Sequence, residues 1–226
     1  MKFSAAITFA ILAVACSPKT EKTVAIDVLL TPSSKMHEKA VSINKQLKQN
    51  YNAGFSLDEN HVPHITLLQC YVFEKDLPAI FERLQGSYES IKEENLLAEA
   101  FYYSKENDPS FAMINIQKSE PLLKLHEEVI KRVRPFMAAK GDDSAFIQNP
   151  DGSSIGKFTV DYVNGFLNES CYDKYNPHVT VGVAKKDFLD SLSTNRFEKF
   201  EFTPTSLSVY QLGDNGTAQK LLWQEN

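Results

Sequence analysis

Val62-Pro63-His64-Ile65-Thr66-Leu67 and its counterpart Asn176-Pro177-His178-Val179-Thr180-Val181 decide the fold of this chain. In each segment a proline precedes a histidine, a β-branched residue, a threonine and an aliphatic residue. Such alternation of polar and β-branched residues predicts a strand. Residues two apart in a strand point to the same face. The histidine and threonine of each segment should therefore project together, while the aliphatic residues between and after them enter a core.

The elements that follow the two segments repeat in the same order. The histidines stand at positions 64 and 178, about half of the 226-residue chain apart. After each of them the hydrophobic pattern predicts a strand, a helix and two further strands: 64–73, 77–84, 96–103 and 111–116, then 178–184, 186–192, 200–212 and 219–223. The repeat indicates a duplicated, bilobal α+β fold over residues 24–226, with two antiparallel sheets facing a central cleft and helices outside.

Other segments complete this outline. A β-branched run at 24–30 predicts the first strand, and Ser33 or Ser34 begins a helix that reaches about Asn50. Apolar residues at helical spacing predict a long helix from Glu120 to about Met137. The polar stretch 141–156 is predicted to be a loop.

The first sixteen residues differ in kind from the rest. Lys2 gives a positive start and residues 3–15 are almost wholly apolar, which is typical of a signal peptide and too short for a membrane span. Leu12-Ala13-Val14-Ala15-Cys16 resembles the lipobox of bacterial lipoproteins, with Ala13 where a leucine is usual. We therefore expect residues 1–15 to be removed, Cys16 to be lipidated, and 16–23 to be a short tether.

The resemblance to lipoproteins also implies a location. Ser17 rather than an aspartate follows the cysteine, which favours an exported, bacterial outer-membrane lipoprotein on the periplasmic or surface side. A plain secretory peptide cut after Ala15 remains the alternative. The membrane is then a partner through the lipid anchor alone.

The overall charge limits the partners. The formal net charge of −5 argues against binding of long nucleic acid, which requires a basic face. A small nucleotide or oligonucleotide carrying a cyclic phosphate could still bind in a local pocket. We expect a monomer of ordinary globular composition, with 42% hydrophobic and 23% charged residues.

One His-x-Thr segment in a strand is a weak signal, but two copies after proline in a repeated topology are specific. The pair resembles the 2H phosphoesterase superfamily, which includes the 2′–5′ RNA ligase-like proteins and the cyclic phosphodiesterases. The resemblance covers essentially the whole mature chain and implies one motif on each wall of a cleft. It implies that His64 and His178 are catalytic and that Thr66 and Thr180 bind phosphate.

The chemistry fits these residue types. Opening a cyclic phosphate requires a base for the attacking water and an acid for the leaving ribose oxygen, and two histidines can share that work. Threonine hydroxyls can donate to the non-bridging oxygens, where charge develops. The sequence thus predicts a metal-independent phosphoric diester hydrolase of the cyclic phosphodiesterase type, with no cofactor and no metal.

Alternatives stay open at this point. The cleft could belong to an exported, non-catalytic lipoprotein that binds a phosphorylated ligand, or it could carry out RNA 2′–5′ ligase-like chemistry. A metal site at His61, His64 and His178 is disfavoured, because positions three apart in an extended segment face opposite ways.

Several other side chains carry weaker signals. Cys70 should share the face of His64 and Thr66. A Cys70–Cys171 disulfide is possible in an exported protein, although buried free thiols are the default. His37 and His126 are predicted to be solvated on helices. Which histidine is the base stays undecided.

The lipoprotein interpretation predicts the behaviour of one variant. Cys16→Ser should release the protein from membranes or leave it as an uncleaved precursor, because the acyl chains attach to the thiol. Membrane fractionation and mass spectrometry of the N-terminal peptide would measure this. Wild-type protein that fractionates as soluble and carries no acyl chain would contradict the assignment.

Overall fold

The computed structural model describes residues 21–59, 61–194 and 197–226. The expected signal peptide, 1–15, and the expected lipidation site, Cys16, lie outside the described residues. Within those ranges, no helix has both the length and the apolar character needed to cross a membrane. The start of the described chain is held by an ion pair, with Lys22 Nζ 2.9 Å from Glu74 Oε1.

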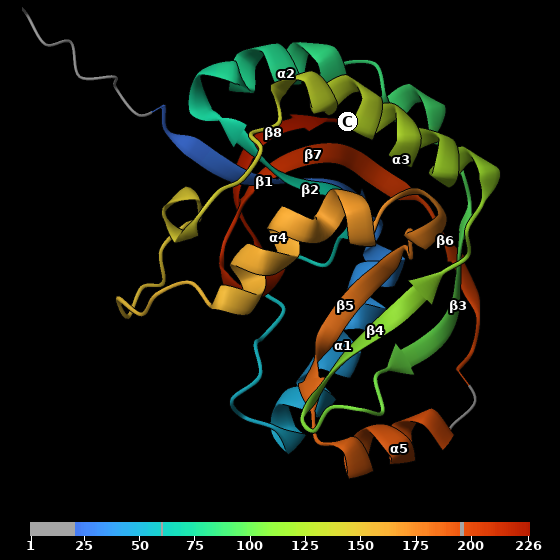
Figure 1. Ribbon diagram of the computed structural model, residues 1–226. Coiled ribbons are helices and arrows are strands. Elements are labelled where there is room, and N and C mark those ends of the chain that lie inside the picture. The colour runs from blue at the N-terminus through green and yellow to red at the C-terminus, as the bar shows by residue number, and fades with distance from the viewer. Residues whose placement is uncertain (1–20, 60, 195–196) are drawn as a thin grey trace, which may run out of the picture.

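The structure contains every predicted strand and helix in the predicted order, and it adds one helix at residues 157–169 (Figure 1). The strands are β1 (Thr23–Pro32), β2 (Ile65–Phe73), β3 (Leu96–Tyr103), β4 (Ser110–Ile116), β5 (His178–Ala184), β6 (Phe200–Phe202), β7 (Pro204–Leu212) and β8 (Ala218–Glu225). The α-helices are α1 (Ser34–Asn50), α2 (Leu77–Leu84), α3 (Glu120–Val133), α4 (Lys157–Glu169) and α5 (Lys186–Thr194). Helix α3 ends earlier than predicted, because Pro135 cannot donate the next helical hydrogen bond.

The strands form two four-stranded antiparallel sheets, in the orders β2-β1-β7-β8 and β5-β4-β3-β6. This confirms the α+β fold class with two antiparallel sheets. The second sheet is one continuous piece of chain, and the first sheet is completed only by the last two strands. The segment 200–212, predicted as one strand, is therefore two strands in different sheets, separated at Thr203.

The long helices also cross between the repeats. Helix α1 follows β1 but packs against β5, and α3 follows β4 but packs against β2. Figure 1 shows α1 behind the sheet of β5, and α2 and α3 together over the sheet of β2. The two motif strands are the outermost strands of their sheets and contact each other. Each half of the molecule is thus built from both halves of the chain.

Both motif strands carry a β-bulge directly after the motif threonine. The register passes from Val28↔Leu68 to Leu29↔Thr66, which leaves Leu67 unpaired, and it skips Val181 in β5 in the same way. A bulge inserts one residue and reverses the alternation beyond it. The prediction that Cys70 shares the face of His64 is therefore wrong: Cys70 packs in the core.

Each bulge is held by a buried polar side chain from the helix that packs against it. The Asn44 amide on α1 donates to Val181 O at 3.0 Å, and the His126 Nδ1–H on α3 donates to Leu67 O at 2.8 Å. His126 Nε2 in turn accepts from the Tyr172 N–H at 3.0 Å. The prediction that His126 is solvated is wrong, because the residue is 1% exposed and both of its ring nitrogens are hydrogen-bonded.

Asn44, like His126, also bonds the backbone of a segment that leads to one of the motif histidines. Its amide also donates to Phe55 O at 3.1 Å, and its Oδ1 accepts from the Leu57 N–H at 2.9 Å. Phe55 and Leu57 lie in the segment that leads to His64, as Tyr172 lies in the segment that leads to His178. Each side chain therefore ties the bulge of one motif to the entrance of the other.

Asn44→Ala and His126→Ala should each lower the free energy of unfolding by about 2–4 kcal/mol, because each leaves several buried backbone groups unpaired. Urea unfolding would measure the change. His37→Ala is the matched control: it removes an exposed helix histidine and should stay within about 0.5 kcal/mol of wild type. Equal stability of all three variants would exclude the clamping role.

Candidate active site

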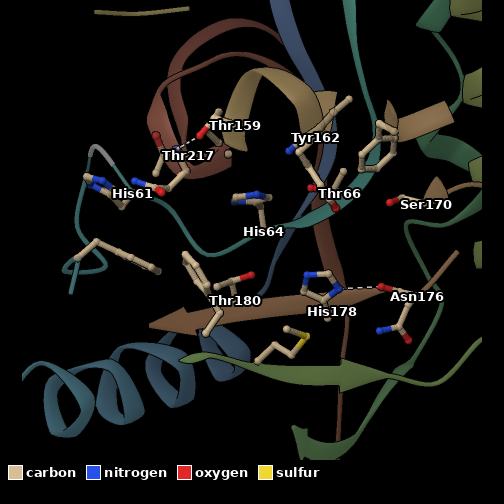
Figure 2. Close-up of a pocket in the computed structure, with 18 of the residues that line it drawn as sticks. His61, His64, Thr66, Thr159, Tyr162, Ser170, Asn176, His178, Thr180 and Thr217 are labelled. Carbon is tan, nitrogen blue, oxygen red and sulfur yellow. Dashed lines mark hydrogen bonds between the residues drawn. The ribbon is translucent and has the colours of Figure 1, made fainter. Parts of the chain in front are cut away.

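The two motifs meet in one cavity of about 320 Å³. His64 and Thr66 line it from β2 and its approach, and His178 and Thr180 line it from β5. Figure 2 shows the two imidazole rings on opposite sides of this space, with His178 and Thr180 rising from the β5 ribbon. All four predicted site residues are thus brought together in the arrangement that the repeat implied.

The two imidazoles are fixed in the same tautomer by the same local bond. His64 Nδ1 lies 2.7 Å from Val62 O, and His178 Nδ1 lies 2.7 Å from Asn176 O. A carbonyl can only accept, so Nδ1 carries the proton in both rings. The other nitrogen, Nε2, is then the one that can take up or release a proton in either ring.

Burial affects both rings in the same direction. Desolvation lowers the pKa of His64, opposed by its bond to Val62. Desolvation also lowers the pKa of His178, opposed by its bond to Asn176, and the charge of His64 lowers it further. The two rings therefore sense each other, and protonation of one disfavours protonation of the other.

A buried carboxylate lies behind the first motif. Asp27 on β1 is 0% exposed, and its Oδ2 accepts from the Thr66 hydroxyl and from the Gln69 amide, both at 2.8 Å. The same oxygen lies 3.6 Å from His64 Nε2, while Asp27 Oδ1 has no hydrogen-bond partner. Burial raises the pKa of Asp27 to about 7, although the bonds from Gln69 and Thr66 act in the opposite direction. Asp27 was not among the predicted site residues, because it lies inside a predicted apolar strand.

The second motif has no such carboxylate. Relative to the two bulges, the position in β4 that corresponds to Asp27 is Phe111, which lines the cavity and is 39% exposed. Thr66 and Thr180 consequently have different surroundings. Thr66 donates its single O–H to a carboxylate, whereas Thr180 lines the same cavity as Phe111 and has no carboxylate in the corresponding place.

Helix α4, absent from the predicted outline, packs against β2 and forms another wall of the cavity. It contributes an aromatic surface, in which Phe158 is 71% exposed and its ring stacks on Tyr162 with 6.1 Å between centroids. The helix start is anchored by Asp214, which accepts from the Thr159 hydroxyl at 2.6 Å and from the Gly156 N–H at 3.1 Å. Buried residues at helical spacing, Thr159, Val163 and Phe166, were the signal that could have revealed it.

Residues flanking the second motif have separate roles. Tyr175 is buried, stacks on the His126 ring with 3.8 Å between centroids, and donates to Thr66 O at 3.0 Å. Lys174 lines the cavity, and its ammonium donates to Asn168 O at 3.0 Å. Lys157 pairs with Asp161 on the surface of α4. Tyr175 therefore joins the two motifs directly.

The remaining candidates are also placed. His61 lies at the cavity and stacks on Phe55 with 5.7 Å between centroids. In the described ranges, no three His, Cys, Asp or Glu side chains are grouped so that they could hold a metal ion. Cys70 and Cys171 are free and buried, as the default interpretation had it.

The chain resembles known proteins in sequence and in structure. A family model described as the 2′-5′ RNA ligase superfamily matches residues 32–216. No curated protein matches the chain. Solved structures that resemble it include TT0787 of Thermus thermophilus, at 15% identity, TM-score 0.45, and coverage of 89% of this chain and 96% of that chain.

Two further solved structures are similar at lower scores. Usb1 of Kluyveromyces marxianus shares 14% identity at a TM-score of 0.39, with 91% of this chain and 98% of that chain covered. LigT of E. coli, solved in complex with phosphate, shares 8% identity at a TM-score of 0.33, with 90% and 97% covered.

The match to the family model spans most of the chain and includes both His-x-Thr motifs, whose resemblance to the 2H phosphoesterases pointed to the same group. The chain belongs to the 2′-5′ RNA ligase superfamily.

Proposed function

We propose that the protein hydrolyses a cyclic phosphodiester, on a nucleotide or at an RNA end, without a metal ion. One observation carries the proposal: two histidines on opposite sides of one cavity are held by Nδ1 to backbone carbonyls, which leaves both Nε2 atoms for proton transfer. A pure binding site has no need of two such groups. Membership of a family of phosphoester-processing proteins supports the chemistry in general.

The reaction is an in-line displacement at phosphorus. One neutral histidine takes a proton from water through Nε2, and the water oxygen forms the new P–O bond. The P–O bond to the leaving ribose oxygen breaks with its electron pair, and that oxygen takes the Nε2 proton of the other, protonated histidine. Thr66 and Thr180 donate to the non-bridging oxygens. Thr66 does so in exchange for its bond to Asp27.

The lining of the cavity favours a nucleotide. Phe158, Tyr162 and Phe111 offer exposed ring faces on which a nucleobase can stack. Among the described lining residues, Lys174 is the sole lysine or arginine, and a backbone carbonyl already accepts from its ammonium. A site so poor in cations suits the single charge of a cyclic diester better than the double charge of a monoester.

We further propose that the enzyme works outside the cytoplasm on a lipid anchor at Cys16, with residues 1–15 as its signal peptide. The apolar run before Cys16 supports this. The substrate would then be a small nucleotide or oligonucleotide that reaches the outer envelope.

Loss of either histidine tests the function. His64→Ala and His178→Ala should each lower kcat on 2′,3′-cyclic mononucleotides by about 10²–10⁴-fold, because each removes a positioned proton-transfer group. The double variant should be hardly worse than the poorer single one, since the two groups act as a unit. Thr66→Val and Thr180→Val should cost less. Steady-state kinetics with a circular-dichroism check of folding would measure this, and a folded histidine variant with near-wild-type turnover would leave only a binding cleft.

The dependence on pH and on chelators gives a second test. Activity should be bell-shaped in pH, falling on the acid side as the base is protonated and on the alkaline side as the acid loses its proton. Burial lowers the pKa of both rings, so the acid limb should lie below the ordinary histidine value of 6.5. Turnover should persist after dialysis against EDTA. Activity abolished by EDTA and restored by one divalent ion would contradict the metal-independent mechanism.

A further inference from the structure

Asp27 is a buried carboxylate for which the fold itself gives no reason. It is 0% exposed on a strand whose other inward residues are apolar, and its Oδ1 has no hydrogen-bond partner. A buried ionisable group without full pairing is costly to the folded state. Its one ion-pair partner among the described residues is His64, with Oδ2 3.6 Å from Nε2.

The position of this carboxylate breaks the symmetry of the two motifs. Both rings have the same tautomer, the same backbone partner two residues earlier, and the same bulge beyond the threonine. The two motifs differ in the residue at one corresponding position of the neighbouring strand. On β1, next to the strand of His64, that residue is Asp27, and on β4, next to the strand of His178, it is Phe111. Only the first ring therefore has a carboxyl group beside it, and the ionised form of that group can stabilise an imidazolium.

We propose that Asp27 is a positioning residue that makes His64 the general acid and leaves His178 as the general base. This rests on the function proposed above. An imidazolium alone in a buried cavity is strongly disfavoured, whereas an imidazolium beside a carboxylate forms a pair with no net charge. The pair can thus carry one proton near neutral pH, and when that proton lies on His64 Nε2 it is where the leaving oxygen needs it.

The geometry leaves that proton free to move. At 3.6 Å, Asp27 Oδ2 is too far from Nε2 for a good hydrogen bond, so the carboxylate acts through its charge. Gln69 holds the carboxylate in place from the side of the cavity, and Thr66 does so as well until its O–H turns to the phosphate. The Nε2 proton passes to the ribose oxygen as its bond to phosphorus breaks, while His178 Nε2 gains the proton of the attacking water. His178 then loses its proton to solvent and His64 takes one up, which restores the starting state.

The other titratable groups around Asp27 do not compete. The charge of Asp27 affects Cys70, Tyr162 and Tyr175, and Tyr210 pairs with Asp27 in the sheet. Burial raises the pKa of each of these four groups, so all of them are neutral near pH 7. The charge of His64 also lowers the pKa of His178. His178 has no carboxylate beside it and is lowered in pKa by burial, so it is the ring that stays neutral, as a base requires.

Titration of the histidine rings by NMR tests the proposal without any substrate. In the wild type, His64 should titrate at a higher pH than His178. In Asp27→Asn, which keeps the shape and removes the charge, the His64 pKa should fall by about one unit or more. The His178 pKa should not fall with it, because a neutral His64 no longer repels the proton of the second ring. Phe111→Leu, the matched change on the other sheet, should leave His64 unmoved. A wild-type His64 that titrates below His178, or an Asp27→Asn that shifts neither ring, would overturn the proposal even if the enzyme is active.

Kinetics then assign the roles. Because His64 must be protonated to act as the acid, Asp27→Asn should move the alkaline limb of the kcat profile to lower pH by about the shift of the His64 pKa. The acid limb should not move to lower pH, and KM should change little. A shift of the acid limb instead would make His64 the base and refute the assignment. An equal loss of kcat at every pH would indicate a purely structural role for Asp27 and refute it as well.

Discussion

The hydrogen bonds from Asn44 to Val181 O and from His126 to Leu67 O hold the two motif strands in the shape that the site requires. Without the bulges, the strands would continue their alternation and turn different side chains toward the cavity. A bulge leaves a backbone carbonyl unpaired in the ladder, and that carbonyl is tolerated in a core only when a side chain satisfies it. Helix α1, which carries Asn44, also lies close to the bulge in β5. A Cβ added at Gly182, whose φ is +142°, would lie 3.0 Å from Asn44 Nδ2.

These bonds depend on the exchange of elements between the repeats. Helix α1 reaches the sheet of the second motif and α3 that of the first, so each clamp joins residues far apart in the chain. His126 adds a ring stack on Tyr175, whose hydroxyl bonds Thr66 O, and thereby ties the first motif to the approach of the second. The spacing of the two imidazoles is set by the same contacts that hold the core together.

The sequence was sufficient for the motifs, the strands that carry them, and the α+β class, because these depend on local alternation and on a visible repeat. It was insufficient wherever a long-range contact decided the outcome. Cys70 was assigned to the wrong face because a bulge at Leu67 has no signature in the residues themselves. His126 looked like an exposed helix residue because its partners, Leu67 O and the Tyr172 N–H, are distant in the chain. Asp27 was hidden in an apolar strand, and its role depends on a neighbour 37 positions later.

The cavity has two different walls: the motif strands on one side and the aromatic surface of helix α4 on the other. The motif strands, clamped from behind, fix the two histidines and two threonines, and such preorganisation is what the proposed in-line displacement demands. Helix α4 brings the exposed aromatic rings and is anchored at its start by Asp214, apart from the clamps. Changes at the exposed rings of α4, Phe158 and Tyr162, can therefore alter which ligand enters while His64 and His178 keep their places. The two motifs carry nearly the same residues at corresponding places in the two sheets. One difference on the neighbouring strands, the carboxylate of Asp27 where the other sheet has Phe111, is enough to make the two imidazole rings unequal.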